Sequence, residues 1–285
     1  MEGRRPEDPT ADRSKQDITE ILRAWEYDES NALRRVRTQD GREVIQVRLP
    51  LGIEQYEIDG RPDGRRPEGR ESWLEYYLEK ARAAEREAPV SGRASPRAGR
   101  GFSLSEEDFI RLHEEGILYY HRYLLFFRMQ EYALCARDTR RNLKLANFVS
   151  RHADPGLAED LVQYRPYIIR MHFTSRALLE IQTGGDLRRA IRALRAGKRC
   201  VDRLPLMPGN DVFALERERA LASLRDLVRQ LRDQIPPSPK VQLRRLLRAA
   251  VLEEDYERAA ALRDEIARLE GRDPEDPAEG GSGPP

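Results

Sequence analysis

The stretch from Lys240 to Glu270 constrains the fold of this chain more than any other part of its sequence. It reads KVQLRRLLRAAVLEEDYERAAALRDEIARLE, with apolar residues at helical spacing on both sides of an acidic turn. These residues are Leu243, Leu246, Leu247, Ala250 and Val251 before the turn, and Ala259, Leu262, Ile266 and Leu269 after it. The pattern predicts an antiparallel helical hairpin. Because two such helices bury too little apolar surface to fold alone, their leucine face is predicted to dock on the same chain, a second copy or a partner.

The second half of this stretch also carries a family signature. The run AVLEEDYERAAALRDEIARLE has an acidic turn before an aromatic residue at Asp255 and Tyr256, an alanine pair at Ala259 and Ala260, and an LRDEI run that begins at Leu262. It resembles the UVR motif, which is found in the helicase and in the nuclease of the excision-repair system, and in adaptors and regulators of the Clp protease. The resemblance implies pairing between proteins and not catalysis. It further implies a bacterial protein linked to nucleotide excision repair or to Clp-dependent protein quality control.

The hairpin supplies the candidate interaction residues, and two interpretations of it stay open. It is either a contact module for a protein partner or a homodimer, or the last packing element of a helical domain. The expected contact residues are Leu243, Leu246, Leu247, Val251, Tyr256, Ala259, Leu262, Arg263, Ile266 and Leu269.

Residues 102–235 also follow a helical period and are predicted to form a helical-hairpin domain. Ser105 and Asp108 have the spacing of a capping box at its first helix, whose aromatic residues are predicted to lie in the core. The segments EYALCA at 131–136, DLRRAI at 186–191 and DYERAA at 255–260 repeat at helix starts. The middle copy is similar to a tetratricopeptide unit. Leu221 to Ile235 has a coiled-coil-like seam. Residues 102–235 are therefore predicted to form stacked helical hairpins.

The N-terminal region changes period from helix to strand. Residues 17–86 are predicted to form a small α+β domain with an antiparallel β-meander, in which a helix around 72–86 covers the sheet. The expected strands are Ala32 to Thr38, Glu43 to Leu49 and Ile53 to Ile58. Residues 87–101 are predicted to be a flexible linker, and residues 1–16 and 271–285 to be disordered. The fold class is therefore mainly α: stacked helical hairpins, a C-terminal UVR-like antiparallel helical hairpin and a small N-terminal antiparallel β-meander.

Composition limits the function classes. Charged residues make up 35% of the chain and hydrophobic ones 39%, which is typical of long exposed helices beside a modest core. The 51 basic and 50 acidic residues nearly cancel, so net charge gives no argument for nucleic acid. No apolar run approaches the ~18 residues of a membrane span, and the N-terminus lacks a signal-peptide core, so a cytoplasmic protein without a membrane partner is expected. Cys135 and Cys200 are predicted to be reduced core residues.

Motifs for catalysis are missing from the sequence. It has no G-x-x-x-x-G-K-[ST], no G-x-G-x-x-G, no C-x-x-C and no H-E-x-x-H. No catalytic, cofactor-binding or metal-ligating residue is assigned, and the prediction is a non-enzymatic interaction protein that needs no cofactor. An enzyme with an unrecognised site in the aromatic helical core is a third hypothesis.

The second hypothesis is a nucleic-acid-associated accessory factor that uses the basic helix at 186–203. The candidate contacts are Arg188, Arg192, Arg195 and Arg199. Such a run is more often a solvated helix face, and that interpretation is favoured here. A similar choice applies to the arginine-rich loop from Arg61 to Arg70, for which a solvated connector is favoured over a phosphate contact.

Overall fold

The computed structural model describes residues 17–87 and 101–270. It is mainly α-helical with one small antiparallel sheet near the N-terminus, which confirms the predicted fold class. The chain divides into two compact units between residues 228 and 229. The predictions for 1–16 and 271–285, and nearly all of the predicted linker 87–101, lie outside the described residues.

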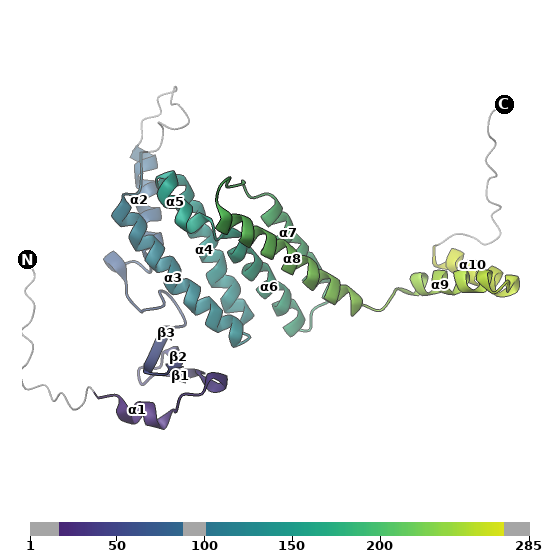
Figure 1. The fold of residues 1–285 in the computed structure, drawn as a ribbon, viewed down its shortest axis with the longest axis horizontal. Coiled ribbons are helices and arrows are strands. Elements are labelled where there is room, and N and C mark those ends of the chain that lie inside the picture. Colours follow the sequence, from purple (N-terminus) through teal and green to yellow (C-terminus); the bar gives the residue numbers. More distant parts are fainter. Residues whose placement is uncertain (1–16, 88–100, 271–285) are drawn as a thin grey trace, which may run out of the picture. The chain divides into compact units, whose positions relative to one another are not determined.

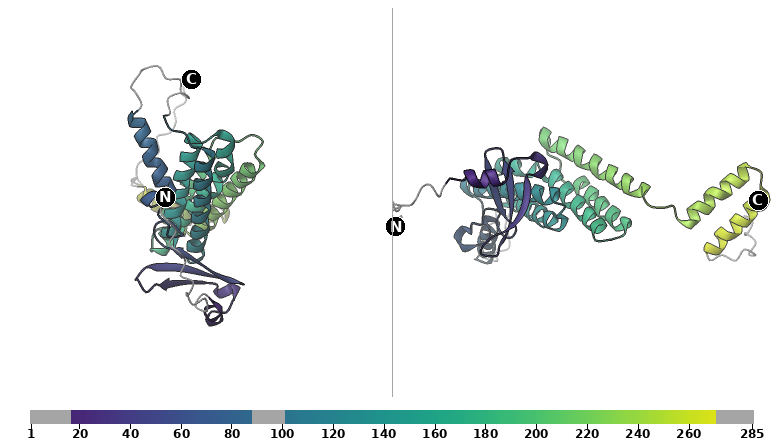
Figure 2. Two further views of the ribbon diagram at one scale, coloured as in Figure 1. Left: turned by 90° about the vertical axis from the view of Figure 1, so that its left-hand side faces the viewer. Right: turned by 90° about the horizontal axis from the view of Figure 1, so that it is seen from below.

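The predicted β-meander is present with almost the predicted bounds (Figure 2). It follows a short helix, α1 (Thr19–Ala24), and a 3₁₀ turn. The strands are β1 (Leu33–Arg37), β2 (Glu43–Leu49) and β3 (Gly52–Glu57), in the order β1-β2-β3. Central β2 pairs through Ile45 with Arg35 on one side and Tyr56 on the other. Gly41, which has a φ of 86°, forms the β1–β2 turn because a side chain is disfavoured in that conformation.

The sheet packs on the end of α3 (Glu106–Arg128) and not on α2 (Trp73–Glu87), the helix that the sequence suggests as its cover. Ile45, Val47 and Ile58 share a buried cluster with Tyr123 and Phe126 of α3. In place of the sheet, α2 joins a second cluster with α3, α4 (Tyr132–His152) and α5 (Pro155–Val162). Residues 17–87 therefore share both cores with the helices and are not a separate domain. A three-stranded sheet needs such cover because it buries too little on its own.

The helices of the first unit form a layer in which α3, α4, α6 and α7 pack successively (Figure 1). The remaining bounds are α6 (Arg165–Gln182), α7 (Leu187–Asp202) and α8 (Asp211–Asp233). The predicted capping box is present at α3, where the Ser105 side chain accepts from the Asp108 N–H and the Asp108 carboxylate accepts from the Ser105 N–H. Gly197 of α7 permits close packing, since a Cβ there would meet the Cβ of Phe173 on α6 at 2.7 Å.

The same turn closes the hairpins α3/α4, α6/α7 and α9 (Pro239–Leu252)/α10 (Tyr256–Leu269). Each first helix ends in a Schellman motif, in which a residue with positive φ follows the helix and the next N–H bonds back into its last turn. The positive-φ residues are Gln130 at 60°, Gly184 at 74° and Glu254 at 58°. The returning bonds are Glu131 to Phe126 at 2.8 Å, Gly185 to Glu180 at 2.7 Å and Asp255 to Ala250 at 2.9 Å. The repeated segments EYALCA, DLRRAI and DYERAA follow these turns.

A buried ion pair fixes the segment after β3 to the helices. Arg122 of α3 and Asp138 of α4 are each 1% exposed, and Nε of Arg122 lies 2.7 Å from Oδ2 of Asp138. Nη1 of Arg122 donates to the carbonyls of Glu57 and Gly60 at 2.8 and 2.9 Å. The arginine therefore satisfies both a buried carboxylate and backbone groups, which offsets its desolvation.

A second buried carboxylate, Glu115 of α3, caps the start of α2. It accepts the N–H groups of Trp73 and Leu74 at 2.7 and 3.1 Å, and it lies 3.3 Å from Nη1 of Arg61. Arg61 is thus paired inside the protein, while Arg70 pairs with Glu79 on the surface. Arg65, Arg66 and Arg70 are exposed, as in the favoured interpretation of a solvated connector, whereas Arg61 is not solvated.

Candidate protein-interaction site

The second unit contains the hairpin of α9 and α10. The hydroxyl of Ser238 accepts the Val241 N–H at the start of α9, and the carboxylate of Asp255 accepts the Arg258 N–H at 3.0 Å at the start of α10. Between them, Glu254 adopts the left-handed conformation, which is uncommon for a side chain with a Cβ. Local capping therefore defines both helix ends and the turn.

Part of the apolar stripe of each helix is buried in the interior of the hairpin. Ala250 of α9 and Ala259 and Ile266 of α10 are buried, and both alanines lie next to the turn. Small side chains there let the two backbones approach. At the open end, Nζ of Lys240 and Nη2 of Arg244 lie 2.5 and 3.0 Å from Oε1 of Glu270. Exposed pairs of this kind contribute little stability, so the interior holds the hairpin together.

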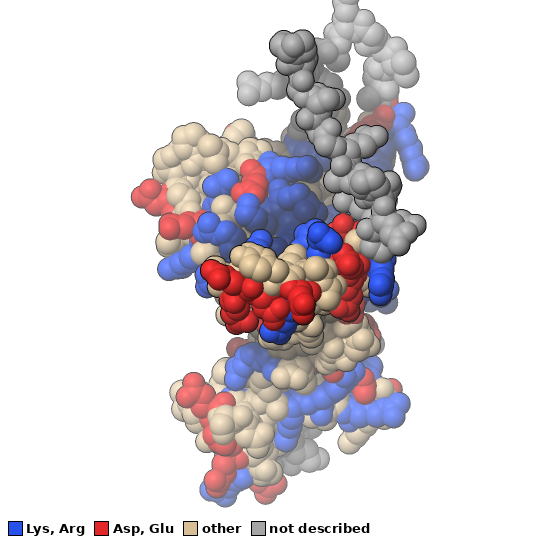
Figure 3. Space-filling model, turned by 90° about the vertical axis from the view of Figure 1, so that its right-hand side faces the viewer, with Lys and Arg blue, Asp and Glu red and all other residues tan. Residues whose placement is uncertain are grey.

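The turn end of the hairpin presents an apolar surface. Val251, Leu252 and Tyr256 are 51%, 85% and 70% exposed, and these three residues are called the hairpin tip. Four acidic residues next to them in the sequence are also exposed: Glu253, Glu254, Asp255 and Glu257. Figure 3 shows acidic side chains gathered beside uncharged ones on the hairpin. Apolar anchors with a charged rim are typical of a contact surface.

The structure divides the ten expected contact residues between the inside and the outside of the hairpin. Ala259 and Ile266 are buried in it, Leu243, Leu247 and Leu262 are half-buried, and Leu246, Val251, Tyr256, Arg263 and Leu269 are exposed. The two helices therefore bury part of that face against each other, and the expectation that the face docks elsewhere stays a prediction, since Leu246, Val251 and Leu269 are exposed. Sequence reasoning missed Leu252, the most exposed apolar residue of the hairpin. The sequence signal for Leu252 was its position next to the turn and outside the apolar stripe, which indicates an exposed apolar side chain.

The basic helix of the second hypothesis is α7. Its inner stripe, Ala190, Leu194 and Val201, is buried. Arginines occupy the opposite side at helical spacing, and Figure 3 shows Lys and Arg side chains gathered on the side of the molecule that carries α7 and α8. These residues, Arg188, Arg192, Arg195, Arg199 and Arg203, are exposed, and no ion pair joins them to any residue that the structure describes.

The two cysteines lie in different surroundings. Cys135 is buried as predicted, and burial raises the pKa of its thiol to about 11, so it is not an activated nucleophile. Cys200 was predicted to lie in the core but is exposed, because its position lies outside the buried stripe of α7. Within residues 17–87 and 101–270, no group of three or more His, Cys, Asp or Glu could hold a metal ion. No helix of that part is long and apolar enough to cross a membrane.

The second unit thus contains a capped two-helix hairpin with a buried interior and an exposed apolar tip. Residues 240–272 match the family model described as the UvrB/uvrC motif. The hairpin is therefore a UVR motif, and the resemblance seen in the sequence is confirmed for this segment. Comparison with curated proteins and with solved structures gave no match.

Proposed function

We propose that this protein is a non-enzymatic interaction protein that binds a protein partner through the tip of its UVR hairpin. One observation carries this proposal: Leu252 and Tyr256 are exposed although the hairpin interior is already filled by other residues. Exposed large apolar side chains that do not stabilise the fold are candidate contact residues, since a few such residues contribute most of the binding free energy at most interfaces.

The charge around the tip specifies the chemistry of the partner. Glu253, Glu254, Asp255 and Glu257 are the acidic neighbours of Leu252 and Tyr256. A complementary surface has an apolar pocket with basic residues at its rim, because such charges accelerate encounter and disfavour wrong partners. A second copy of the chain is the alternative partner. The UVR match supports a setting in nucleotide excision repair or in Clp-dependent protein quality control.

Removal of the hairpin tests this function. The full chain and a chain that ends at residue 235 are used as bait for proteins from the source cells, and their self-association is compared by analytical ultracentrifugation. The truncated chain is expected to keep the cooperative melt of residues 1–228, since they form a compact unit, and to lose the partner. A partner that is retained in full by the truncated chain would overturn the proposal.

A second candidate function is contact with nucleic acid through α7. It is favoured by the exposed arginine row of that helix, which is formed by Arg188, Arg192, Arg195 and Arg199 and has no carboxylate partner in the described part of the chain. Each phosphate that an arginine neutralises releases counterions, so binding depends steeply on salt.

Reversal of these four arginines to glutamate is expected to abolish binding to duplex or single-stranded DNA or RNA at ~50 mM salt, where the unmodified chain binds. The measurement is fluorescence anisotropy over a salt series. The matched control reverses Arg23, Arg37, Arg82 and Arg86, which are exposed arginines outside α7 and outside the loop from Arg61 to Arg70. Equal loss in both variants would indicate a net-charge effect, and no binding by the unmodified chain would remove this candidate.

A further inference from the structure

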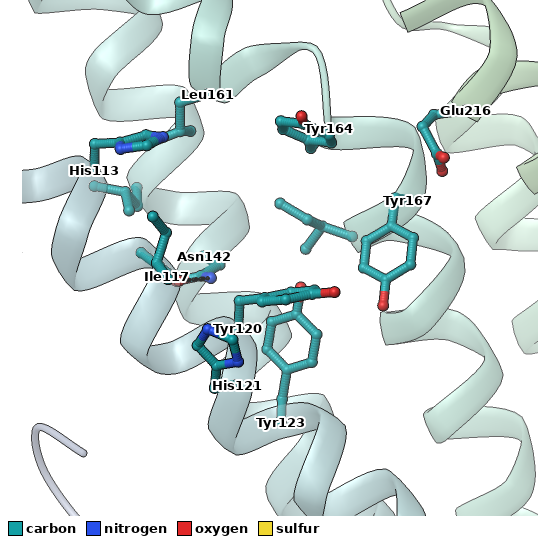
Figure 4. Close-up of a pocket in the computed structure, with 13 residues that line it drawn as sticks. His113, Ile117, Tyr120, His121, Tyr123, Asn142, Leu161, Tyr164, Tyr167 and Glu216 are labelled. Carbon is teal, nitrogen blue, oxygen red and sulfur yellow. Dashed lines mark hydrogen bonds between the residues drawn. The ribbon is translucent and has the colours of Figure 1, made fainter. Parts of the chain in front are cut away.

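A pocket opens on the first unit. Its volume is about 480 Å³, which lies in the range of small-molecule sites. Figure 4 shows its walls, with α3 on one side and α6 on the other. Its lining includes Tyr120 and Tyr123 of α3, Tyr164 and Tyr167 at the start of α6, and Glu216 of α8.

Aromatic rings gather at one end of this pocket. The ring centroids of Tyr120 and Tyr123 are 5.5 Å apart, and those of Tyr120 and Tyr167 are 6.1 Å apart. Burial raises the pKa of Tyr123 and of Tyr167, so both remain neutral phenols. Their ring faces carry partial negative charge, which attracts cations. Arg170 lies over the Tyr167 ring at 5.1 Å, so this ring already holds one cation of the protein itself.

A carboxylate lies on the side of the pocket that carries Tyr167. The Glu216 side chain is 14% exposed, and Arg219 donates to its Oε1 at 3.3 Å. Its Oε2 is buried and has no hydrogen-bond partner. Figure 4 shows Glu216 on the side of the pocket that carries Tyr164 and Tyr167, with His113 at the opposite side. A buried carboxylate oxygen without a partner is costly, and a positive charge in the neighbouring pocket would lower that cost electrostatically.

We infer that this pocket binds a small organic cation, an ammonium or guanidinium group with an apolar body. The tyrosine rings that line the pocket hold the cation, and the Glu216 carboxylate attracts it. A neutral ligand of the same shape would leave the charge of Oε2 uncompensated. The pocket is therefore expected to select ligands by their charge and not by their shape.

Calorimetric titration of the full chain tests this inference. The probes are choline, its uncharged isostere 3,3-dimethylbutan-1-ol, and N-acetylarginine amide, all at equal ionic strength. Choline or the arginine probe is expected to bind saturably and about tenfold or more tighter than the isostere, which is the scale of a desolvated cation–π contact. A tighter arginine probe would identify a peptide side chain as the source of the cation, and tighter choline a free small molecule.

Two variants locate the site. Glu216→Gln and Tyr120→Leu should each reduce the affinity for the cation about tenfold, while Glu218→Gln, the same change at an exposed residue of α8 outside the pocket lining, should leave it unchanged. Thermal unfolding of each variant checks that the fold is kept. The inference is overturned by equal binding of choline, the arginine probe and the isostere, by no saturable binding of any probe, or by a folded Glu216→Gln variant with unchanged affinity.

Discussion

Replacement of Leu252 and Tyr256 with serine is expected to weaken partner binding roughly 30-fold or more, the ~2 kcal/mol that defines an anchor residue at an interface. Both side chains project outside the hairpin, at 85% and 70% exposure, so their loss should not disturb the contacts of Ala250, Ala259 and Ile266. Binding is measured with the partner captured by the full chain, by titration against each variant.

The control for this variant removes an equally exposed leucine elsewhere. Leu51 lies between β2 and β3 and is 93% exposed, so Leu51→Ser matches the change at Leu252 without touching the hairpin. It should bind the partner as the unmodified chain does. If the tip variant binds with unchanged affinity and a folded hairpin, the tip is not the contact surface.

Substitution inside the hairpin has a different meaning. Ile266 is buried between α9 and α10, so Ile266→Asp would place a charge in the hairpin interior and unfold it. Loss of the partner in that variant would show only that a folded hairpin is required. The tip residues separate recognition from folding because the fold does not depend on them.

The second large effect is expected at the buried ion pair of the first unit. Arg122→Met removes the bidentate partner of the buried Asp138 carboxylate, which keeps only Arg137 at 3.0 Å, and removes a donor from the carbonyls of Glu57 and Gly60. Loss of one member of such a pair typically costs about 3–5 kcal/mol. Urea unfolding of the variant should therefore show a much lower midpoint, with the sheet released first, since Arg122 joins the segment after β3 to α3.

Two further variants separate this effect from the loss of any positive charge. Lys144→Met removes a surface pair with Glu75, in which the side chains are 49% and 42% exposed, and should cost less than about 1 kcal/mol. The double variant Arg122→Met with Asp138→Leu should be more stable than Arg122→Met alone, because no charge is left buried. A double variant as unstable as the single one would show that the carbonyl contacts dominate.

Local patterns predicted the elements that depend on neighbours in sequence. The capping box at Ser105 and Asp108, the β-meander and the acidic turn of the UVR hairpin all follow from residues within a few positions of one another. The similarity of the segments EYALCA, DLRRAI and DYERAA can be seen in the sequence. The Schellman turns that cause it, with positive φ at Gln130, Gly184 and Glu254, could not be predicted, because only Gly184 is a glycine.

The sequence by itself determined the helical period, the helix ends and the UVR motif, since these depend on hydrogen bonds and side-chain spacing within one or two turns. Only the tertiary structure decided which apolar residues of the hairpin face inward, so that Ile266 is interior while Leu252 is exposed. It also placed the sheet on α3 and α4, paired Arg122 with Asp138, and brought Glu216 to the tyrosines of α3 and α6. Each of these contacts joins residues far apart in the chain, and their burial depends on the packing of whole elements, which no local pattern encodes.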